Sequence, residues 1–327
     1  MQTTALIRPA SVVVAAVFLS TGLAACSSGP VEPDCEPLAA GDNSALVSVS
    51  DATPPALDFP TPLVSPQVEL SVIEPGDGPV VQPGSYVSLS YVSATGDGAP
   101  GAVVGFDTDT PALSLPFNDD ETTPPILLDS LECVAEGSTV VVTGPLDSAF
   151  GQGAAAAQGL DPSASVVFAF RVDSVVPPRA DGAEQWVTTP GLPSVALAPD
   201  GTPGVTIPRS DPPTAFTMAT LKAGWGPVVN EGDSVTVKYS GFLWTEQTQF
   251  DTTWDDGVPL TVAMDGQSVV PGFQQAIVGQ HVGSQVIAVL PPEVAYGSEG
   301  SGAIPADATL VFVIDILDVD DGEDVAE

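Results

Sequence analysis

Two neighbouring residues in the C-terminal half, Phe250 and Asp251, combine an aromatic ring and a carboxylate inside an otherwise apolar pattern. The same segment supplies three further rings, at Tyr239, Phe273 and Phe312. Rings of this kind can exclude water from a bound group and so favour a less polar transition state over a polar ground state. A carboxylate in apolar surroundings must find a hydrogen-bond donor. We therefore expect an aromatic hollow with one carboxylate, against the alternative that these rings are only core.

Other chemistries are poorly supported by the composition. His281 is the only histidine, so a histidine-based metal cluster is excluded, and its expected place on an exposed turn argues against a Ser/His/Asp triad. The predicted chemistry needs no metal and no cofactor. The chain carries 6 basic and 42 acidic residues, a net charge of −36. Nucleic-acid binding is excluded because phosphate neutralisation needs basic residues.

Strands and one short helix must position these side chains. Val235, Val237 and Tyr239 alternate with polar residues, which predicts a strand with Tyr239 on its buried face. Pro271 to Gly279 predicts a helix too short to stand alone, so it must lie across a sheet. The runs 285–290 and 310–317 have the β-branched content of strands, with Leu310, Phe312, Ile314 and Ile316 on one face.

Five segments of this half, in order, resemble FK506-binding (FKBP) type peptidyl-prolyl isomerases. They read GDSVTVKYSGFL, QFDTTW, GQSVVPGFQQAIVGQHVGSQV, LPPEVAYG and GAIPADATLVFVIDILDV. The resemblance implies an α+β fold, an antiparallel β-sheet wrapped around one short α-helix. It also implies catalysis of X-Pro isomerisation, whose barrier of roughly 18–20 kcal/mol comes from amide resonance. An apolar pocket that removes water from the planar amide and holds a twisted bond would lower that barrier.

The resemblance also implies roles for individual residues. The rings of Tyr239, Phe250, Phe273 and Phe312 would surround the proline ring, and Asp251 would organise Tyr239. The Val270 amide and the Tyr296 hydroxyl would hold substrate carbonyls, and the remaining substrate-binding residues would be Val269 and Ile304.

Three departures from the family pattern are present. Phe273 stands where tryptophan is common, the acidic pair Asp255-Asp256 replaces a basic residue, and the loop GSEGSG after Tyr296 is short. The basic residue could have formed an ion pair with Asp251, whose charge is then less well compensated. We expect an active but slow enzyme with an altered preference for the residues around the proline.

The first half resembles a diverged copy of the same domain. Gly84 to Tyr91 repeats the spacing of Gly232 to Tyr239, and Phe106-Asp107 mirrors Phe250-Asp251. Phe168 corresponds to Phe312, and Phe150 replaces the Tyr296 hydroxyl. The VVPGF segment is replaced by TTPPILLDSLECV, which has no aromatic residue. We expect an impaired binding or scaffolding module, with a fold retained only for stability as the alternative.

The N-terminus predicts export. An apolar run from Ser11 to Leu19 follows Arg8 and is shorter than the roughly 20 residues of a membrane-spanning helix. It ends in Leu-Ala-Ala-Cys, which resembles a bacterial lipobox, so Cys26 would be diacylated, by palmitate for example; an ordinary signal is the alternative. Cys35 and Cys133 then remain as an even pair that can form a disulfide, against a buried Cys133 and an exposed Cys35.

The predicted layout has two FKBP-like domains. It runs from a lipoprotein signal peptide (1–25) and a tether (26–67) to a diverged domain (68–176), a linker (177–215), an isomerase domain (216–319) and an acidic tail (320–327). A bridge at Cys35 would order part of the tether, and the alternating apolar residues of GLPSVALAPDGTPGVTI in the linker would allow it to pair with one of the sheets. The loss of Arg8 with the signal leaves five basic residues and a net charge of −37, so membrane contact should come through the lipid.

The expected partners are exported proteins with X-Pro bonds, met by a monomer lipid-anchored to the outer face of the cell membrane. The alternatives are a non-catalytic module that binds proline-bearing segments and an immunoglobulin-like adhesion sandwich. The second of these leaves Phe250-Asp251 unexplained.

Overall fold

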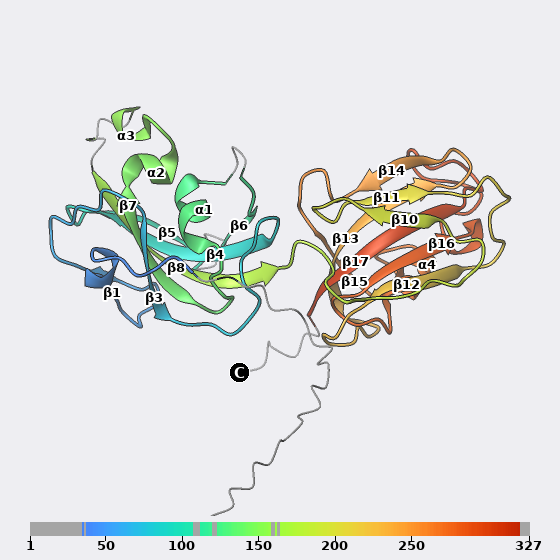
Figure 1. Ribbon diagram of the computed structural model, residues 1–327, viewed down its shortest axis with the longest axis horizontal. Helices are drawn as coiled ribbons and strands as arrows, with labels where there is room; N and C mark the ends of the chain where they lie inside the picture. Colours follow the sequence, from blue (N-terminus) through green and yellow to red (C-terminus); the bar gives the residue numbers. More distant parts are fainter. Residues whose placement is uncertain are drawn as a thin grey trace, which may run out of the picture.

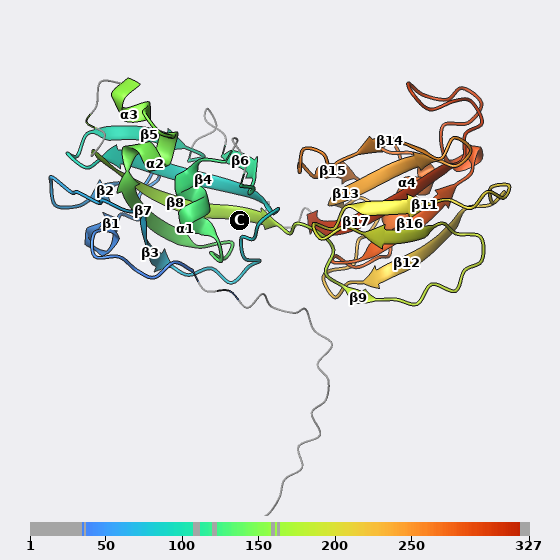
Figure 2. The same ribbon diagram turned by 45° about the horizontal axis from the view of Figure 1, so that its top comes forward.

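A computed structural model describes residues 35, 37–106, 112–119, 123–157, 161 and 164–320 (Figure 1). The predicted signal peptide, Cys26, Asp107 and residues 321–327 of the predicted tail lie outside the described residues. Each half of the chain forms one antiparallel sheet, of six strands in the first half and seven in the second. Figure 2 shows the two sheets side by side.

The elements have the following bounds. The first sheet contains β3 (Glu69–Glu74), β4 (Tyr86–Thr95), β5 (Pro100–Val104), β6 (Leu113–Pro116), β7 (Thr139–Pro145) and β8 (Ser165–Val176). The second contains β9 (Ala183–Glu184), β12 (Thr217–Ala223), β13 (Ser234–Leu243), β14 (Thr248–Thr252), β15 (Leu260–Ala263), β16 (Gln285–Leu290) and β17 (Leu310–Asp320). Two hairpins pair β1 (Ser48–Val49) with β2 (Leu57–Asp58) and β10 (Ser194–Leu197) with β11 (Pro203–Thr206). The helices are η1 (Ser44–Leu46), α1 (Pro125–Leu131), α2 (Leu146–Phe150), α3 (Ala154–Ala157), α4 (Pro271–Ile277) and η2 (Pro292–Val294).

The two sheets share one strand order. The first runs β3-β7-β8-β4-β5 with β6 paired to β4, and the second runs β12-β16-β17-β13-β14 with β15 paired to β13. The register agrees as well, because Ser93 lies opposite Phe168 in the first sheet and Gly241 opposite Phe312 in the second. Each strand of one sheet therefore has a counterpart in the other, while β9 extends only the second sheet.

One face of each sheet, here called the helix face, is covered by a seven-residue helix, α1 or α4. The predicted helix at Pro271 is confirmed: proline is its first residue, its buried residues include Phe273 and Ile277, and Gly279 follows it with a φ of +85°. The four residues predicted to share one face of β17 all belong to the core beneath α4. The sequence therefore predicts this face correctly.

The opposite face of each sheet, the hairpin face, is also covered, which corrects two predicted segments. Residues 40–67 of the predicted tether pack on the first sheet through β1, β2, Val47 and Leu63. Residues 177–215, predicted as a linker, place β10 and β11 on the second sheet, and β9 pairs with β12. The reason is that the second sheet also carries apolar side chains on this face, among them Trp244, Val311 and Val313, and these must be covered.

A disulfide joins Cys35 and Cys133, whose Cα atoms are 5.6 Å apart. It attaches the start of the described chain to the residue just after α1. Within the described residues, no helix is long and apolar enough to cross a membrane.

Candidate functional site

Four rings predicted from the sequence converge on the helix face of the second sheet. Phe312 is central: its ring centroid lies 5.3 Å from that of Phe273, 5.7 Å from that of Phe250 and 6.0 Å from that of Tyr239. The rings of Tyr239 and Phe273 are 5.7 Å apart. Three of these four contacts are edge-to-face, a favoured arrangement of aromatic pairs. We call these four residues the ring cluster.

The ring cluster has a buried base and a half-exposed rim. Phe273 from α4 and Phe312 from β17 are 4% and 5% exposed and form the base. Tyr239 from β13 and Phe250 from β14 are half-buried and form the rim. A ligand ring could therefore touch aromatic carbon without opening the core.

Asp251 lies at the edge of this cluster, where the Tyr239 hydroxyl donates a hydrogen bond to its Oδ2. Its Oδ1 accepts a bond from the Thr252 amide at 2.9 Å. Burial raises the pKa of Tyr239, and the hydrogen bond and charge of Asp251 raise it further, so the hydroxyl stays protonated and keeps donating. The expectation of an apolar environment for Asp251 is wrong, since this carboxylate is exposed to solvent.

The other predicted residues surround the cluster. Val269 and Val270 are half-buried and pack against its core, and Ile304 is 9% exposed in that core. Val270 precedes α4, and its carbonyl accepts bonds from the Phe273 and Gln274 amides. The Val270 amide itself makes no hydrogen bond within the described part of the chain. Tyr296 is 38% exposed and close enough to Tyr239 to raise the pKa of that hydroxyl.

Several residues that position the cluster were not predicted. A Cβ added at Gly241 would lie 2.6 Å from Phe250 Cζ and 3.0 Å from Phe312 Cε1, so only glycine lets the two rings approach there. Two threonine hydroxyls hold the backbone of Tyr239. Thr252 Oγ1 donates to the Tyr239 carbonyl, and the Tyr239 amide donates to Thr253 Oγ1. An unusually close backbone approach at a strand glycine leaves no periodic signal, which explains why Gly241 was missed.

On the hairpin side of β13, Lys238 is 4% exposed and its Nζ lies 5.2 Å from the ring centroid of Trp254. Lys238 therefore points away from Asp251 and does not supply the missing cation. Among the described residues, Arg171–Asp173 is the only ion pair, and no group of three His, Cys, Asp or Glu residues could hold a metal ion.

The first sheet carries a different cluster at the corresponding place. Tyr91, Phe168 and Phe170 lie with ring centroids 5.0 to 5.8 Å apart. Leu127 of α1 takes the position of Phe273, which confirms that this place in the first half carries no aromatic residue. Phe150, on α2, is 57% exposed.

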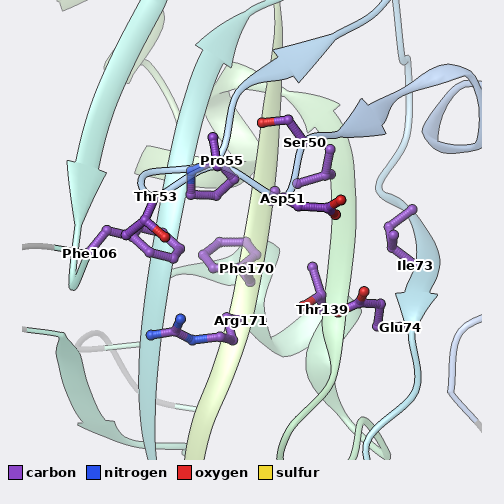
Figure 3. Close-up of a pocket in the computed structure, with 13 residues that line it drawn as sticks. Ser50, Asp51, Thr53, Pro55, Ile73, Glu74, Phe106, Thr139, Phe170 and Arg171 are labelled. Atoms are coloured by element: carbon purple, nitrogen blue, oxygen red, sulfur yellow. The ribbon is translucent and has the colours of Figure 1, made fainter.

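The proposed match of Phe106 with Phe250 is wrong. Phe106 packs on the hairpin face of the first sheet, where the Arg171 guanidinium carbon lies 4.9 Å from its ring centroid. Figure 3 shows its ring between Thr53 and Arg171, at the edge of a hollow beneath the β1–β2 hairpin. The physical reason is the pairing of the edge strands: Phe250 lies inside β14, between the partners of Gly241 and Phe242, whereas Phe106 lies after the end of β5, two residues beyond the partner of Tyr91.

Comparison with known proteins supports the resemblance of the second half to FKBP-type isomerases. A family model described as FKBP-type peptidyl-prolyl cis-trans isomerase matches residues 226–317. An "FK506-binding protein" of Streptomyces anulatus is 33% identical over 119 residues, 36% of this chain and 96% of that protein. A "Probable FK506-binding protein" of Corynebacterium glutamicum is 33% identical over 115 residues, 35% of this chain and 96% of that protein. The isomerase FkpA of Escherichia coli K12 is 36% identical over 106 residues, 32% of this chain and only 38% of FkpA.

Proposed function

We propose, from the premise that this chain belongs to the FKBP-type peptidyl-prolyl cis-trans isomerase family, that the ring cluster of its second half is where isomerisation takes place. The chain is a peptidyl-prolyl cis-trans isomerase. The observation that carries the assignment of the site is the convergence of Tyr239, Phe250, Phe273 and Phe312 beside one carboxylate.

The proposed mechanism is desolvation with positioning. The proline ring lies on Phe273 and Phe312, which contribute no polar atoms, so the amide before it loses the water that stabilises its planar, polar form. The twisted amide has lost conjugation and polarity and is therefore favoured there over the planar form. The reaction is a rotation about the C–N bond, and no covalent bond forms or breaks. Neither a nucleophile nor a proton transfer is therefore required.

Two polar groups orient the bound segment in this proposal. The Val270 amide, which has no hydrogen-bond partner among the described residues, donates to one substrate carbonyl, and the exposed Tyr296 hydroxyl donates to another. Val269 and Ile304 contact the neighbouring side chains of the substrate. Asp251 fixes the ring of Tyr239 through the hydrogen bond between them and so holds it in edge-to-face contact with Phe273.

The first half is proposed to be a diverged FKBP-like domain that does not catalyse. The shared strand order and register support common ancestry of the two sheets. The absence of catalysis follows from Leu127 in place of Phe273 and from the position of Phe106 on the opposite face.

Export and anchoring are also proposals. The apolar run before Cys26 and the Leu-Ala-Ala-Cys sequence support a lipid anchor, and the Cys35–Cys133 disulfide suits an oxidising compartment outside the cytosol. The clients would be exported proteins whose folding waits on X-Pro isomerisation, which takes roughly 10–100 s uncatalysed. Replacing Cys26 by serine should release the protein from the membrane fraction, and unchanged sedimentation with membranes would contradict the anchor.

The test of the site uses the mature chain and a short proline peptide whose cis-to-trans relaxation is followed by absorbance. Phe250→Ala should reduce kcat/KM by about tenfold or more, since about 1.4 kcal/mol of lost transition-state contact is tenfold in rate. Phe106→Ala is the matched control, because it removes a half-buried ring from the hairpin face of the first sheet, and it should leave the rate unchanged.

Equal rates for wild-type protein and Phe250→Ala would contradict the assignment of the ring cluster. An uncatalysed rate with the wild-type chain would favour the alternative, a non-catalytic module that binds proline-bearing segments.

A further inference from the structure

The segment between β15 and α4 leads directly into the proposed site. It ends in Val269 and Val270, which are half-buried and pack against the core that contains the ring cluster. The Val270 amide is the proposed donor to a substrate carbonyl, and Phe273, at the base of the ring cluster, follows three residues later on α4. The position of the donor relative to the ring therefore depends on how this segment is held.

Backbone hydrogen bonds do not hold this segment. Met264 is the last residue anchored in that way: its amide donates to the Asp233 carbonyl, and its carbonyl accepts from the Gly232 amide. Within the described part of the chain, residues 265–269 make no backbone-to-backbone bond, and the next such bonds are accepted by the Val270 carbonyl at the start of α4. Five consecutive residues before the donor are therefore without support from a strand or a helix.

The Asp265 side chain provides one substitute for that support. Its Oδ1 accepts hydrogen bonds from the Gln267 and Ser268 amides, both at 2.8 Å, and its Oδ2 accepts one from the Ser268 hydroxyl at 3.1 Å. The bonds from the two amides lower the pKa of this carboxyl group, so it stays ionised and keeps accepting at neutral pH. One carboxylate therefore closes the turn that ends just before Val269.

The Gln274 side chain provides the other support, from α4. Its Oε1 accepts a hydrogen bond from the Gly266 amide at 2.8 Å. Gly266 has a φ of +78°, in the left-handed region that favours glycine, so the sequence suits the bend there. Because Gln274 is the neighbour of Phe273 on the helix, this bond fixes the segment relative to the base of the ring cluster.

We propose that Asp265 and Gln274 are positioning residues, which act on the substrate through the Val270 amide by holding residues 265–268 in place. The proposal rests on the proposed function of the ring cluster and specifies how that site is ordered before the substrate binds. Without the two side chains, the segment would have to be ordered when the peptide binds, and that ordering weakens binding. An interaction made equally with the planar and the twisted peptide affects binding and leaves the rate of the bound peptide unchanged.

The test measures two quantities with the mature full chain and a short proline peptide. One is Kd, from the shift of the Phe312 aromatic signal during a titration, and the other is the cis–trans exchange rate at saturating peptide, by NMR exchange spectroscopy. Asp265→Ala should raise Kd about fivefold, the usual contribution of one hydrogen bond to an equilibrium, and should leave the exchange rate at saturation unchanged. Gln274→Met keeps the length of the side chain but removes the acceptor, and should have the same effect.

Conservative variants and matched controls separate positioning from a general loss of structure. Asp265→Asn and Gln274→Glu keep the accepting oxygens and should bind the peptide nearly as well as wild-type protein. Asp200→Ala opens a turn of the same kind, in which Asp200 Oδ1 accepts the Thr202 amide at 3.0 Å, and should leave Kd unchanged. Gln275→Met alters the exposed neighbour of Gln274 on α4 and should also leave Kd unchanged.

The midpoint of urea unfolding is measured for every variant. A Kd that is unchanged in Asp265→Ala and Gln274→Met, with or without a lower midpoint, would overturn the proposal, since the two side chains would then serve stability alone. An equal rise of Kd in the two controls, or no recovery in Asp265→Asn and Gln274→Glu, would overturn it as well. Failure of the wild-type chain to accelerate exchange would instead contradict the proposed function.

Discussion

At the scale of single residues, the two halves differ in the residue opposite one phenylalanine and in the position of the edge-strand ring. Gly241 lies opposite Phe312 and leaves the space that the ring of Phe250 fills. Ser93 lies opposite Phe168 in the first sheet, and Phe106 there lies on the other face. A Phe-Asp pair in the sequence is therefore insufficient to place a ring, because the position also depends on how the edge strand pairs: Phe250 lies inside β14, whereas Phe106 follows the end of β5.

Gly241→Ser should displace the ring of Phe250 and lower kcat/KM by about tenfold or more, since overpacking by even one or two atoms typically costs about 1–3 kcal/mol. Ser93→Ala, at the corresponding position of the first sheet, is the control and should leave the rate unchanged. The measurement is relaxation of a short proline peptide. Full activity of Gly241→Ser would mean that Phe250 does not contribute to the site.

Tyr239 provides a prediction about pH. Its pKa is raised in the folded protein above the ordinary value of 10.0, so the neutral hydroxyl is favoured by folding. The associated stabilisation is complete below pH 10.0 and is lost as the pH rises through the higher folded value. Asp251→Asn removes the negative charge beside Tyr239, which is one cause of its raised pKa, so Tyr239 should ionise at lower pH in that variant.

The measurement is an alkaline titration of tyrosinate absorbance, with Tyr239→Phe used to assign the last group to ionise. An unchanged titration of Tyr239 in Asp251→Asn would contradict the hydrogen bond between them.

At the scale of elements, the two helices fit their sheets through reciprocal side-chain sizes. In the second sheet a Cβ at Gly272 of α4 would lie 2.5 Å from Leu290 Cγ on β16. In the first sheet Ile126 of α1 lies 3.6 Å from the position a Cβ would take on Gly144 of β7. The glycine at the contact lies on the helix in the second half and on the strand in the first, and the larger residue lies opposite it in both.

Gly272→Ala should therefore destabilise the second half by about 1–3 kcal/mol through overpacking, although alanine in an open helix position is worth roughly 1 kcal/mol over glycine. Gly279→Ala is unsuitable as a control because its φ is positive. Adding Leu290→Ala should recover part of the loss in a double-mutant cycle followed by denaturant unfolding. Stabilisation by Gly272→Ala alone would show that the helix is not held as close to β16 as described.

The helix and strands of the second half could be predicted because their signals are local. Pro271 and Gly279 mark the ends of α4, and β16 has the predicted bounds Gln285–Leu290. The β1–β2 hairpin was missed because its strands are two residues long and lie in a segment rich in proline. The alternating apolar residues of 191–207 did indicate strands there, and this segment forms β10 and β11, which pair with each other and pack on the second sheet. A usable signal was present in β16, which is apolar on both faces and buried throughout, a pattern typical of strands covered on both sides.

The candidate site was predictable to the same extent. Strand and helix periodicity placed Tyr239, Phe273 and Phe312 on buried faces, and the resemblance to the FKBP family added Phe250 to them. The role of Gly241 and the opposite orientation of Phe106 could not be predicted, because both depend on contacts between strands that are distant in sequence.

At the scale of the whole molecule, the repeated unit is longer than the sheet and its helix. Each half includes a preceding hairpin that covers the hairpin face, so the segment between the two sheets belongs to the second unit. Lys238 then connects this unit to the first through the carbonyl of Gly84. This buried cation and the β14–β15 loop both contact the first half.

Lys238→Met should loosen the contact between the halves and increase the radius of gyration measured by small-angle scattering. Lys222→Met is the matched control, because Lys222 Nζ donates to the carbonyl of Ala180 at 2.8 Å, within the second unit, and does not reach the first half. Identical scattering from wild-type protein and Lys238→Met would show that this lysine does not hold the halves together.

The central claim is that isomerisation occurs on the ring cluster of the second half, and exchange spectroscopy by NMR tests it most directly. A short proline peptide with separate cis and trans signals is mixed with the mature chain, and both the exchange rate and the shifts of the protein's aromatic signals are recorded. We predict accelerated exchange with shifts at Tyr239 and Phe312 but none at Tyr91 or Phe168, and a loss of exchange in Phe273→Leu, which introduces the residue that α1 carries at Leu127. Unaccelerated exchange, or acceleration accompanied by shifts at Tyr91 and Phe168 alone, would contradict the account.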